Sequence, residues 1–497
     1  MSIVNNVSGE ALQVLMKRVQ EIFLADEIPW VIGYSGGKDS TAVLQLVWYS
    51  LAELSTDERN KKQVHVISTD TLVEQPIVAL SVNHSLDVMK AAAIEQDMPI
   101  QPHRLTPKAD DSFWVNLIGK GYPAPRQTFR WCTSRLKIEP SNRFIMNMTK
   151  THGEAIVVLG TRKAESARRA ANMRRYEEMR TRDWLSPNGS LPNSWVFTPI
   201  EEWSNDEVWM YLMQNKNPWG RSNKDLLNMY RGASQDNECP LVLDTATPSC
   251  GNSRFGCWVC TMVSADKSME AMIQNDEEKV WMAPLLDLRN EIGVLDEWGR
   301  LDDKHRRDFR RMNGTIKLNH RDGKTIHGPY TKQWREHFLR RLLQVEKEIR
   351  ITGPEEVKNL SLITDDELRE IRRIWIKEKH AFDDLLPVIY EEIRNEKYPY
   401  VNDLEPGPFG KAEWDMLAEL CAGNWVYLEL QSSMLDIEQH TKAITSRRSV
   451  VDDLERAIKK CYYDNAEDAV LFETGRQKLA NTQLSLEEEM EEGLEDQ

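Results

Sequence analysis

The sequence lacks a long apolar run and a targeting segment at its beginning. We find no apolar stretch that approaches the ~20 residues of a membrane-spanning helix, and residues 1–10 have neither a basic nor an apolar stretch. Only 7 of the 497 residues are cysteine, and four of these lie between residues 239 and 260. We therefore expect a cytoplasmic protein with no disulfide framework and no membrane partner.

An excess of positive charge is also absent. The formal net charge is −15, which opposes non-specific adhesion to nucleic acid, although a local basic patch can still bind it. We find no internal repeat, and the length allows two or three domains with full cores.

The sequence around residues 31–40 has neither the Walker spacing nor the Gly-x-Gly-x-x-Gly spacing. It has instead an apolar run at 29–32, which predicts a strand, followed by Ser-Gly-Gly-Lys-Asp-Ser and an apolar-periodic helix. Two glycines allow backbone N–H groups to turn inward, and the helix N-terminus, a lysine and two hydroxyls favour an anion. An ordinary strand–helix turn is the alternative. The candidate phosphate-binding residues are Ser35, Gly36, Gly37, Lys38, Asp39 and Ser40.

Strand and helix patterns alternate along the first part of the chain. Strands are expected at 29–32, 64–70, 100–105 and 155–159, and helices at 9–25, 40–54 and 74–96. This alternation predicts an α/β fold with a doubly wound parallel sheet, whose ligands gather at the carboxyl ends of the strands. Thr69 and Asp70 end the second strand, where they would contact a ligand or simply cap the next helix.

Two further polar clusters follow. Cys132 lies among Arg130, Arg135 and Lys137, which would suit an anionic substrate and would lower the pKa of the thiol. The alternative is a small buried core residue.

Gly160 and Arg162 come directly after the fourth strand, where glycine permits close approach and arginine can fork onto phosphate oxygens. Arg168 and Arg169 lie one turn from Glu165 and would pair with it in a purely structural reading. Ser204 and Glu207 form a capping box, for which we favour the structural reading.

The Ser-Gly-Gly-x-Asp-Ser loop resembles the pyrophosphate loop of the N-type ATP pyrophosphatases. Together with residues 68–71, 130–140, 159–169 and 197–209, it resembles the phosphoadenosine-phosphosulfate (PAPS) reductase-like branch of that superfamily. The resemblance implies an adenine nucleotide α-hydrolase-like fold and cleavage of ATP, with Mg²⁺, to AMP and pyrophosphate. Lys38 and Arg162 would then neutralise charge, Asp39 would orient the loop or the metal, and residues 68–71 would contact adenosine.

True sulfonucleotide reductases differ from this chain in two respects. The chain ends in an acidic run rather than a cysteine-containing tail, and Cys132 stands alone where iron–sulfur members have adjacent cysteines. Reduction of activated sulfate is therefore not expected.

Four cysteines crowd into one short segment punctuated by glycine and proline. A Cys-x-x-Cys pair chelates one metal from a turn, and two further thiolates complete a tetrahedral zinc site or a four-iron cluster. The spacing leaves this choice open. The candidate ligands are Cys239, Cys250, Cys257 and Cys260.

This cysteine segment, placed behind a pyrophosphatase-like domain, is similar to that of the DndC and SspD-type sulfurtransferases of bacterial DNA phosphorothioation. The resemblance implies a [4Fe–4S] cluster on the four cysteines and the replacement of a non-bridging DNA oxygen by sulfur, in a bacterial defence system. A cysteine desulfurase would supply the sulfur, other proteins of the system would bring the DNA, and Cys132 could relay the sulfur. The alternatives are a tRNA-thiolating relative and a non-catalytic nucleotide-binding zinc scaffold.

The sequence predicts four consecutive segments. These are a pyrophosphatase domain at 1–215, an iron–sulfur region at 216–330, a helical region at 331–482 and an acidic, disordered tail at 483–497. Two basic runs, at 304–311 and 335–341, would contact DNA phosphates or form solvated helix faces.

Overall fold

The computed structural model describes residues 7–233, 256–298, 300–319, 323–404, 410–441, 448–476 and 479. The predicted ligands Cys239 and Cys250 and the predicted acidic tail lie outside these residues. The chain divides into two compact units that interleave along the sequence. Unit 1 consists of Met1–Phe113, Pro125–Glu291 and Ile349–Leu360, and unit 2 of Trp114–Ala124, Ile292–Glu348 and Ser361–Gln497. The consecutive segment boundaries expected from the sequence stay a prediction.

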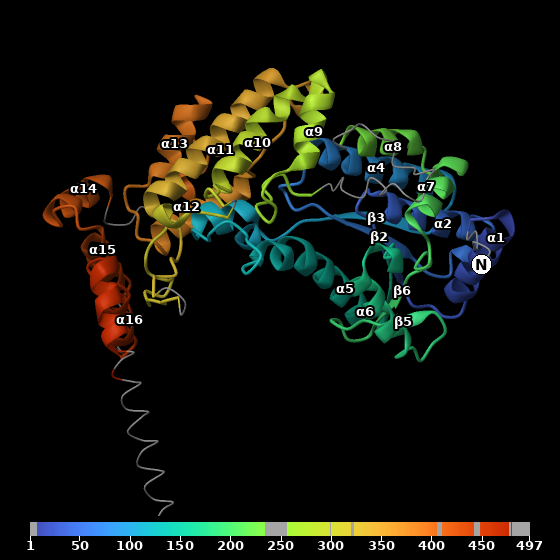
Figure 1. The fold of residues 1–497 in the computed structure, drawn as a ribbon, viewed down its shortest axis with the longest axis horizontal. Coiled ribbons are helices and arrows are strands. Elements are labelled where there is room, and N and C mark those ends of the chain that lie inside the picture. Colours follow the sequence, from blue (N-terminus) through green and yellow to red (C-terminus); the bar gives the residue numbers. More distant parts are fainter. Residues whose placement is uncertain are drawn as a thin grey trace, which may run out of the picture. The chain divides into compact units, whose positions relative to one another are not determined.

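Unit 1 is built on a six-stranded sheet with the order β3-β2-β1-β4-β6-β5 (Figure 1). All neighbouring strands are parallel except β5, which pairs with β6 in the antiparallel sense. The chain leaves β1 in one direction to β2 and β3 and then returns to β4 on its other side, so a crevice is expected between β1 and β4. The α/β fold is confirmed. The strands are β1 (Trp30–Gly33), β2 (Val64–Thr69), β3 (Ile100–Leu105), β4 (Ala155–Val158), β5 (Leu185–Pro187) and β6 (Ser194–Phe197).

Helices cover both faces of this sheet. Trp30 and Ile32 of β1 pack into the core formed with α1, α2, α4 and α7, whereas Val31 packs on the opposite face with Ile145 of α5. This alternation follows from the two-residue period of a strand. The helices of this part of the chain are α1 (Gly9–Leu24), α2 (Lys38–Ala52), α3 (Thr56–Arg59), α4 (Pro76–Glu95), α5 (Glu139–His152), α6 (Ala167–Glu177), α7 (Asn205–Gln214), α8 (Asn223–Gly232), α9 (Lys267–Asn275) and α10 (Ala283–Ile292).

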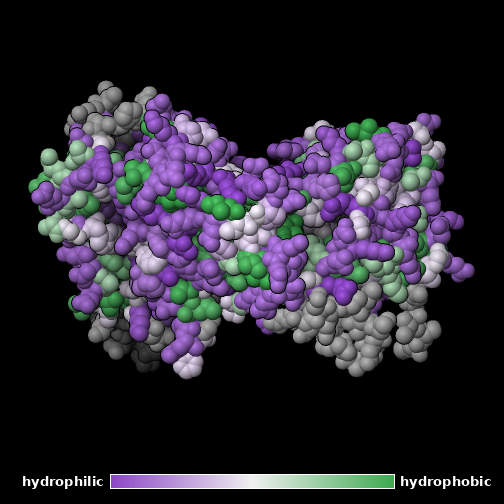
Figure 2. Space-filling view, turned by 90° about the horizontal axis from the view of Figure 1, so that it is seen from above, coloured by the Kyte–Doolittle hydropathy of each residue, from purple (hydrophilic) through white to green (hydrophobic). Residues whose placement is uncertain are grey.

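Helix α4 corrects one expectation from the sequence. By length and composition it is apolar enough to cross a membrane, and among the described helices it alone meets that test. It is the crossover between β2 and β3, where Met89 is fully buried and Leu86 nearly so. One side of α4 therefore contributes to the core of the sheet domain, while Ile94 of the same helix is exposed. The face of the molecule drawn in Figure 2 is mostly hydrophilic, with small apolar patches.

Unit 2 is helical, as the sequence predicts for the C-terminal region. Its core includes the π-helix Val115–Gly119, all of whose residues are buried, and helix α12, which packs against it. Trp375 of α12 donates its indole N–H to the carbonyl of Ile118 at 2.9 Å. The remaining helices are α11 (Lys332–Thr352, which spans the boundary with unit 1), α12 (Asp365–Lys377), α13 (Leu385–Arg394), α14 (Lys411–Leu420), α15 (Trp425–Thr441) and α16 (Arg448–Lys460).

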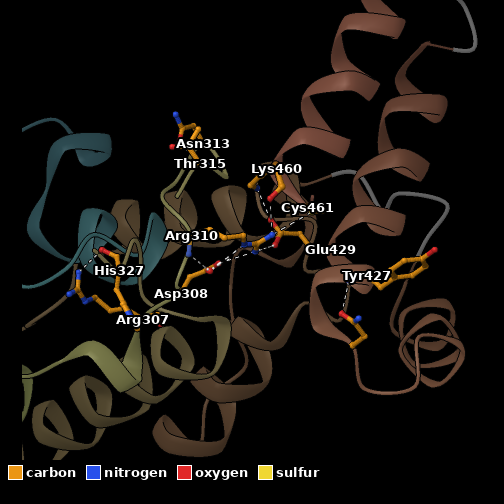
Figure 3. Close-up of polar contacts among 11 residues, drawn as sticks. Arg307, Asp308, Arg310, Asn313, Thr315, His327, Tyr427, Glu429, Lys460 and Cys461 are labelled. Atoms are coloured by element: carbon orange, nitrogen blue, oxygen red, sulfur yellow. Dashed lines mark hydrogen bonds and ion pairs between the residues drawn. The ribbon is translucent and has the colours of Figure 1, made fainter. Parts of the chain in front are cut away.

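Three arginines of the two basic runs of unit 2 are buried, so the expectation of a phosphate-binding or solvated face is wrong for Arg306, Arg310 and Arg335. Arg310 is 2% exposed and contacts Asp308 at 2.9 Å and Glu429 at 2.6 Å (Figure 3). Arg306 is buried over the ring of Trp334, and Arg335 is buried with its guanidinium on the carbonyl of Gly119. Unit 2 thus uses these cations to hold its own elements together.

Candidate active site

The loop of residues 35–40, called the 35–40 loop below, connects β1 to α2. Gly36 has a φ of +72°, and a Cβ built there would lie 2.5 Å from the side chain of Val82. Both observations require glycine at this position. Because α2 begins at Lys38, its N-terminus and the positive end of its dipole face the loop. This is the anion-binding geometry that the sequence predicts.

The two serines brace the loop from within. The Ser40 hydroxyl donates to the carbonyl of Gly37 at 3.0 Å and accepts from the Ser35 N–H at 3.2 Å. The Ser35 and Ser40 oxygens are 3.2 Å apart. The hydroxyls therefore fix the loop's shape, and they accept the N–H groups of Ser35 and, at 3.4 Å, of Gly37.

Asp39 holds two cations at the loop. Lys38 Nζ lies 2.8 Å from one carboxylate oxygen, and Arg162 Nε lies 2.7 Å from the other. Arg162 is 3% exposed and also donates to the carbonyl of Trp203. Because the carboxylate is shared, Asp39 orients both cations toward the loop.

Gly160 is required by its contact with the loop. A Cβ at Gly160 would lie 2.8 Å from the backbone carbonyl of Asp39 and 3.1 Å from the N–H nitrogen of Ser40. The segment after β4 thus packs directly against the start of α2. This contact brings Arg162 into reach of Asp39.

Thr69 and Asp70 lie at the carboxyl end of β2. Asp70 forms an ion pair with Arg104 of β3 and accepts the N–H of Leu72 at 2.8 Å, which holds Leu72 at a φ of 64°. The Thr69 hydroxyl is 3.0 Å from that of Ser141. Asp70 therefore stabilises the turn at Leu72 and lines the cavity described next, but it does not cap the next helix, whose N-cap is Gln75.

A cavity of about 1040 Å³ lies at the carboxyl ends of β1, β2 and β4. Its size suits a nucleotide. It brings together all of the predicted loop and strand-end residues, which are Ser35, Gly36, Gly37, Lys38, Asp39, Ser40, Thr69, Asp70, Gly160 and Arg162.

Several lining residues escaped sequence analysis. Arg104 lies inside a strand and belongs to no recognisable motif, whereas Trp209 is the last residue of the 197–209 segment singled out in the sequence. Tyr230 of α8 lies over the loop, with Lys38 Nζ 6.0 Å from its ring centre, and burial raises its pKa to about 12. Only the fold brings these residues to the cavity.

The Cys-x-x-Cys turn lies beside this cavity. The backbones of Cys257 and Glu74 pair in an isolated antiparallel β-bridge, and the Trp258 N–H donates to the carbonyl of Val73 at 3.0 Å. The sulfur of Cys257 lies 3.4 Å from the Thr71 hydroxyl and 3.9 Å from a Glu74 carboxylate oxygen. Because Glu74 itself lines the cavity, the thiol and the nucleotide-sized space share a wall.

Two cations flank the cysteine turn. Lys137 lies 3.5 Å from Glu74, and Cys257 and Glu74 raise its pKa. Arg289 of α10 is 1% exposed and donates to the carbonyls of Cys260 at 2.9 Å and Ser264 at 2.8 Å. Burial and Glu74 raise the pKa of Cys257 to about 12, so its thiol is neutral without a cation bound to it. Thiolates on a metal carry net negative charge, and this pair of cations fits such a centre.

Cys132 differs from expectation. Burial raises the pKa of its thiol, and the neighbouring Cys260 adds to the effect. The cations expected to lower this pKa are engaged elsewhere, since Arg135 contacts Asp111 and Lys137 contacts Glu74. Cys132, which is one of the described residues, does not line the cavity. The prediction that neighbouring cations lower the pKa of Cys132 is therefore wrong. The relay role stays a prediction.

The sheet order and the loop define an α/β nucleotide-binding domain, and comparison with known proteins places it more closely. Residues 29–262 match the model of the phosphoadenosine phosphosulfate reductase domain. This part of the chain is therefore a PAPS reductase-like domain.

Individual relatives are distant. An uncharacterized protein of Methanocaldococcus jannaschii, MJ0066, is 27% identical over 193 residues, which are 39% of this chain and 33% of that protein. The chain thus matches about a third of the length of this relative.

Solved structures similar to the chain include three enzymes. PAPS reductase from Candida auris is 15% identical over 44% of this chain and 91% of its own, with a TM-score of 0.26. FMN adenylyltransferase from Candida glabrata is 12% identical over 47% of this chain and 63% of its own, with a TM-score of 0.26. The U34-tRNA thiolase NcsA from Methanococcus maripaludis, with its [4Fe–4S] cluster, is 14% identical over 58% of this chain and 82% of its own, with a TM-score of 0.27.

Proposed function

We propose that this protein is an ATP-dependent sulfurtransferase that takes part in DNA phosphorothioation. One observation carries the proposal. Cys257, half of a Cys-x-x-Cys pair, lies 3.9 Å from a carboxylate oxygen of Glu74, and Glu74 lines the same cavity as the 35–40 loop. This proximity supports activation of an oxygen by ATP close to sulfur held by the cysteines.

In the first step, a non-bridging oxygen of a DNA phosphodiester attacks the α-phosphorus of ATP, and pyrophosphate leaves. The 35–40 loop binds the departing pyrophosphate through backbone N–H groups, and Lys38 and Arg162 neutralise its developing charge. The former phosphate oxygen, a poor leaving group, becomes part of AMP.

In the second step, the outer sulfur of a persulfide attacks the phosphorus of the DNA, and AMP leaves with the oxygen. A thiol then attacks the inner sulfur of the resulting P–S–S link, which leaves the phosphorothioate on the DNA and joins the two thiols as a disulfide. A dithiol reductant regenerates the thiols. A cysteine desulfurase supplies the persulfide sulfur, other proteins of the phosphorothioation system present the DNA, and Cys132 is the candidate carrier on this chain.

The residues at hand fit both cofactors. A four-iron cluster would be held by Cys257 and Cys260 together with Cys239 and Cys250, and would supply a centre for sulfur. The flanking Lys137 and Arg289 suit its negative charge. Mg²⁺ would be held largely by the phosphates of ATP, because both oxygens of Asp39 already contact cations.

The test combines two assays on the full chain, isolated without oxygen and mixed with its candidate partners. Release of pyrophosphate from ATP and phosphorothioate in DNA, read by mass spectrometry, are the expected results. The Cys132→Ser and Cys257→Ser variants should lose sulfur incorporation and keep pyrophosphate release. Cys421→Ser, in unit 2, is the matched control and should keep both.

Other outcomes would replace the proposal. Thiolated tRNA in place of modified DNA would assign the protein to tRNA thiolation. Bound zinc without iron or sulfide, combined with no pyrophosphate release, would make it a nucleotide-binding scaffold.

A further inference from the structure

Helix α6 has no buried residue, a property that it shares in unit 1 with the four-residue helix α3. It is held from its ends and one side. The Ser166 hydroxyl caps its N-terminus by accepting the Arg169 N–H at 3.2 Å, and Lys163 contacts Glu177 at 2.6 Å. Its outward side chains therefore do little for the core.

The charge of α6 is strongly one-sided. Its eleven residues contain four arginines and one glutamate, in a chain whose net charge is −15. A solvated helix face commonly mixes both signs in pairs four residues apart. Here Arg169 pairs with Glu165, but within the described residues Arg168, Arg174 and Arg175 have no hydrogen bond or ion pair from their side chains.

Three exposed residues line up along one face of α6. Arg168, Asn172 and Arg175 are spaced at i, i+4 and i+7, which places them in one row about 10 Å long. We call this row the α6 stripe. It suits an extended polyanion better than a single small anion.

The stripe begins at the mouth of the nucleotide-sized cavity. Glu165 and Arg169, which flank the start of α6, both line that cavity, whereas Arg168 and Arg175 do not. Figure 1 shows α6 beside β5, at the edge of the sheet. A chain of phosphates lying on the stripe would therefore lead toward the 35–40 loop.

We propose that the α6 stripe docks the phosphate backbone of the DNA strand that is modified in the cavity. This inference rests on the proposed function for the choice of DNA, and on the charge and position of α6 for the surface. Arginine forks onto phosphate oxygens, and Asn172 adds a neutral donor between the two guanidinium groups. The surface gives the acidic chain a local means of holding a polyanion.

The test measures binding of the full chain to fluorescein-labelled oligo(dT) by anisotropy over a series of salt concentrations. The Arg168→Gln/Arg175→Gln double variant should bind about tenfold more weakly, and the slope of log K against log salt should fall by about 1.4, since each single-strand phosphate contact contributes about 0.7. The matched control is Lys17→Gln/Lys90→Gln, two exposed cations on α1 and α4, which should keep the wild-type slope.

Each further outcome decides the proposal. An unchanged slope in the α6 variant, or no binding of oligo(dT) by the wild type, would overturn it. Preference for an RNA strand of equal length, or equal competition by polyglutamate, would also overturn the assignment to DNA. Pyrophosphate release and sulfur incorporation are measured separately, so the proposed function can fail while the stripe still binds DNA, and the reverse.

Discussion

Two arginine-rich segments that look alike in sequence have opposite uses in the structure. At 304–311 in unit 2, Arg306 and Arg310 are buried, and Arg310 contacts two carboxylates. At 167–177 in unit 1, the arginines are exposed, and only Arg169 has an ion pair among the described residues. The number of cations is similar, but their neighbours differ.

The difference shows that a basic run has no meaning apart from the carboxylates and aromatic rings that the fold brings to it. Glu429 and Trp425 reach Arg310 from α15, more than a hundred residues later in the chain. From the part of the chain that the structure describes, no such partner reaches Arg168 or Arg175. A buried arginine thus acts as a structural tie, and an exposed one remains available to a ligand.

The largest expected effect is the loss of the tie in unit 2. Arg310→Met should lower the free energy of unfolding by about 3 kcal/mol, because it leaves the half-buried Asp308 without its cation and removes the link to α15. Urea denaturation measures the change. Arg311→Met alters the exposed neighbouring residue and should change stability little. Equal stability of the two variants would contradict the structural role of Arg310.

The next effect concerns a cation that faces a ligand. Lys38→Ala should reduce ATP cleavage to AMP and pyrophosphate by about 10²-fold or more, because a preorganised charge at the phosphates is lost. Its thermal stability should stay close to that of the wild type, in contrast to Arg310→Met. Lys61→Ala, at an exposed position after α3, is the control. Wild-type turnover by Lys38→Ala would reject the role, and ADP as the product would reject the reaction.

The smallest effect is a pH dependence in unit 2. Burial alone would raise the pKa of Glu429, but Lys460 and Arg310 more than offset this and lower it to about 2. In the unfolded chain, the pKa of a glutamate carboxyl is about 4.3. The ionised Glu429 therefore contributes stability above that pH, and the contribution is lost as pH falls from about 4.3 toward 2.

Replacing Glu429 tests this directly. Glu429→Gln should be less stable at neutral pH and should lose less stability on acidification than the wild type does. Urea denaturation at several pH values measures both. Glu419→Gln, at an exposed acid on α14, should keep the wild-type profile. An identical acid profile for Glu429→Gln and the wild type would remove Glu429 as the cause.

Much of the fold and of the candidate site follows from local sequence. The strand–glycine–helix pattern at 30–40 requires only neighbouring residues, and the capping box of Ser204 and Glu207 forms as expected. The sequence predicts that another group approaches Gly160 closely, and in the structure this group is the backbone of Asp39. These features depend on backbone geometry, which short motifs encode.

The remaining features depend on long-range contacts. Arg289, behind the Cys-x-x-Cys turn, lies in an ordinary apolar helix and contacts carbonyls 25 to 29 residues away. The cations around Cys132 suggested a thiolate, but the fold pairs them with Asp111 and Glu74 and buries the thiol. Pairing partners and burial are properties of the assembled fold, and no local pattern reports them.

The interleaving of the two units has a consequence for synthesis on the ribosome. Residues 114–118 are apolar or neutral, and α12 packs against them, with the hydrogen bond from Trp375 to Ile118 joining residues 257 positions apart. A growing chain emerges from its N-terminus, so this segment waits exposed while more than two hundred further residues are made. Closing so long a loop is also slow. The nascent chain therefore needs protection from aggregation at this segment. We expect chaperones to remain bound until α12 has been synthesised, even after the strands of the sheet are complete.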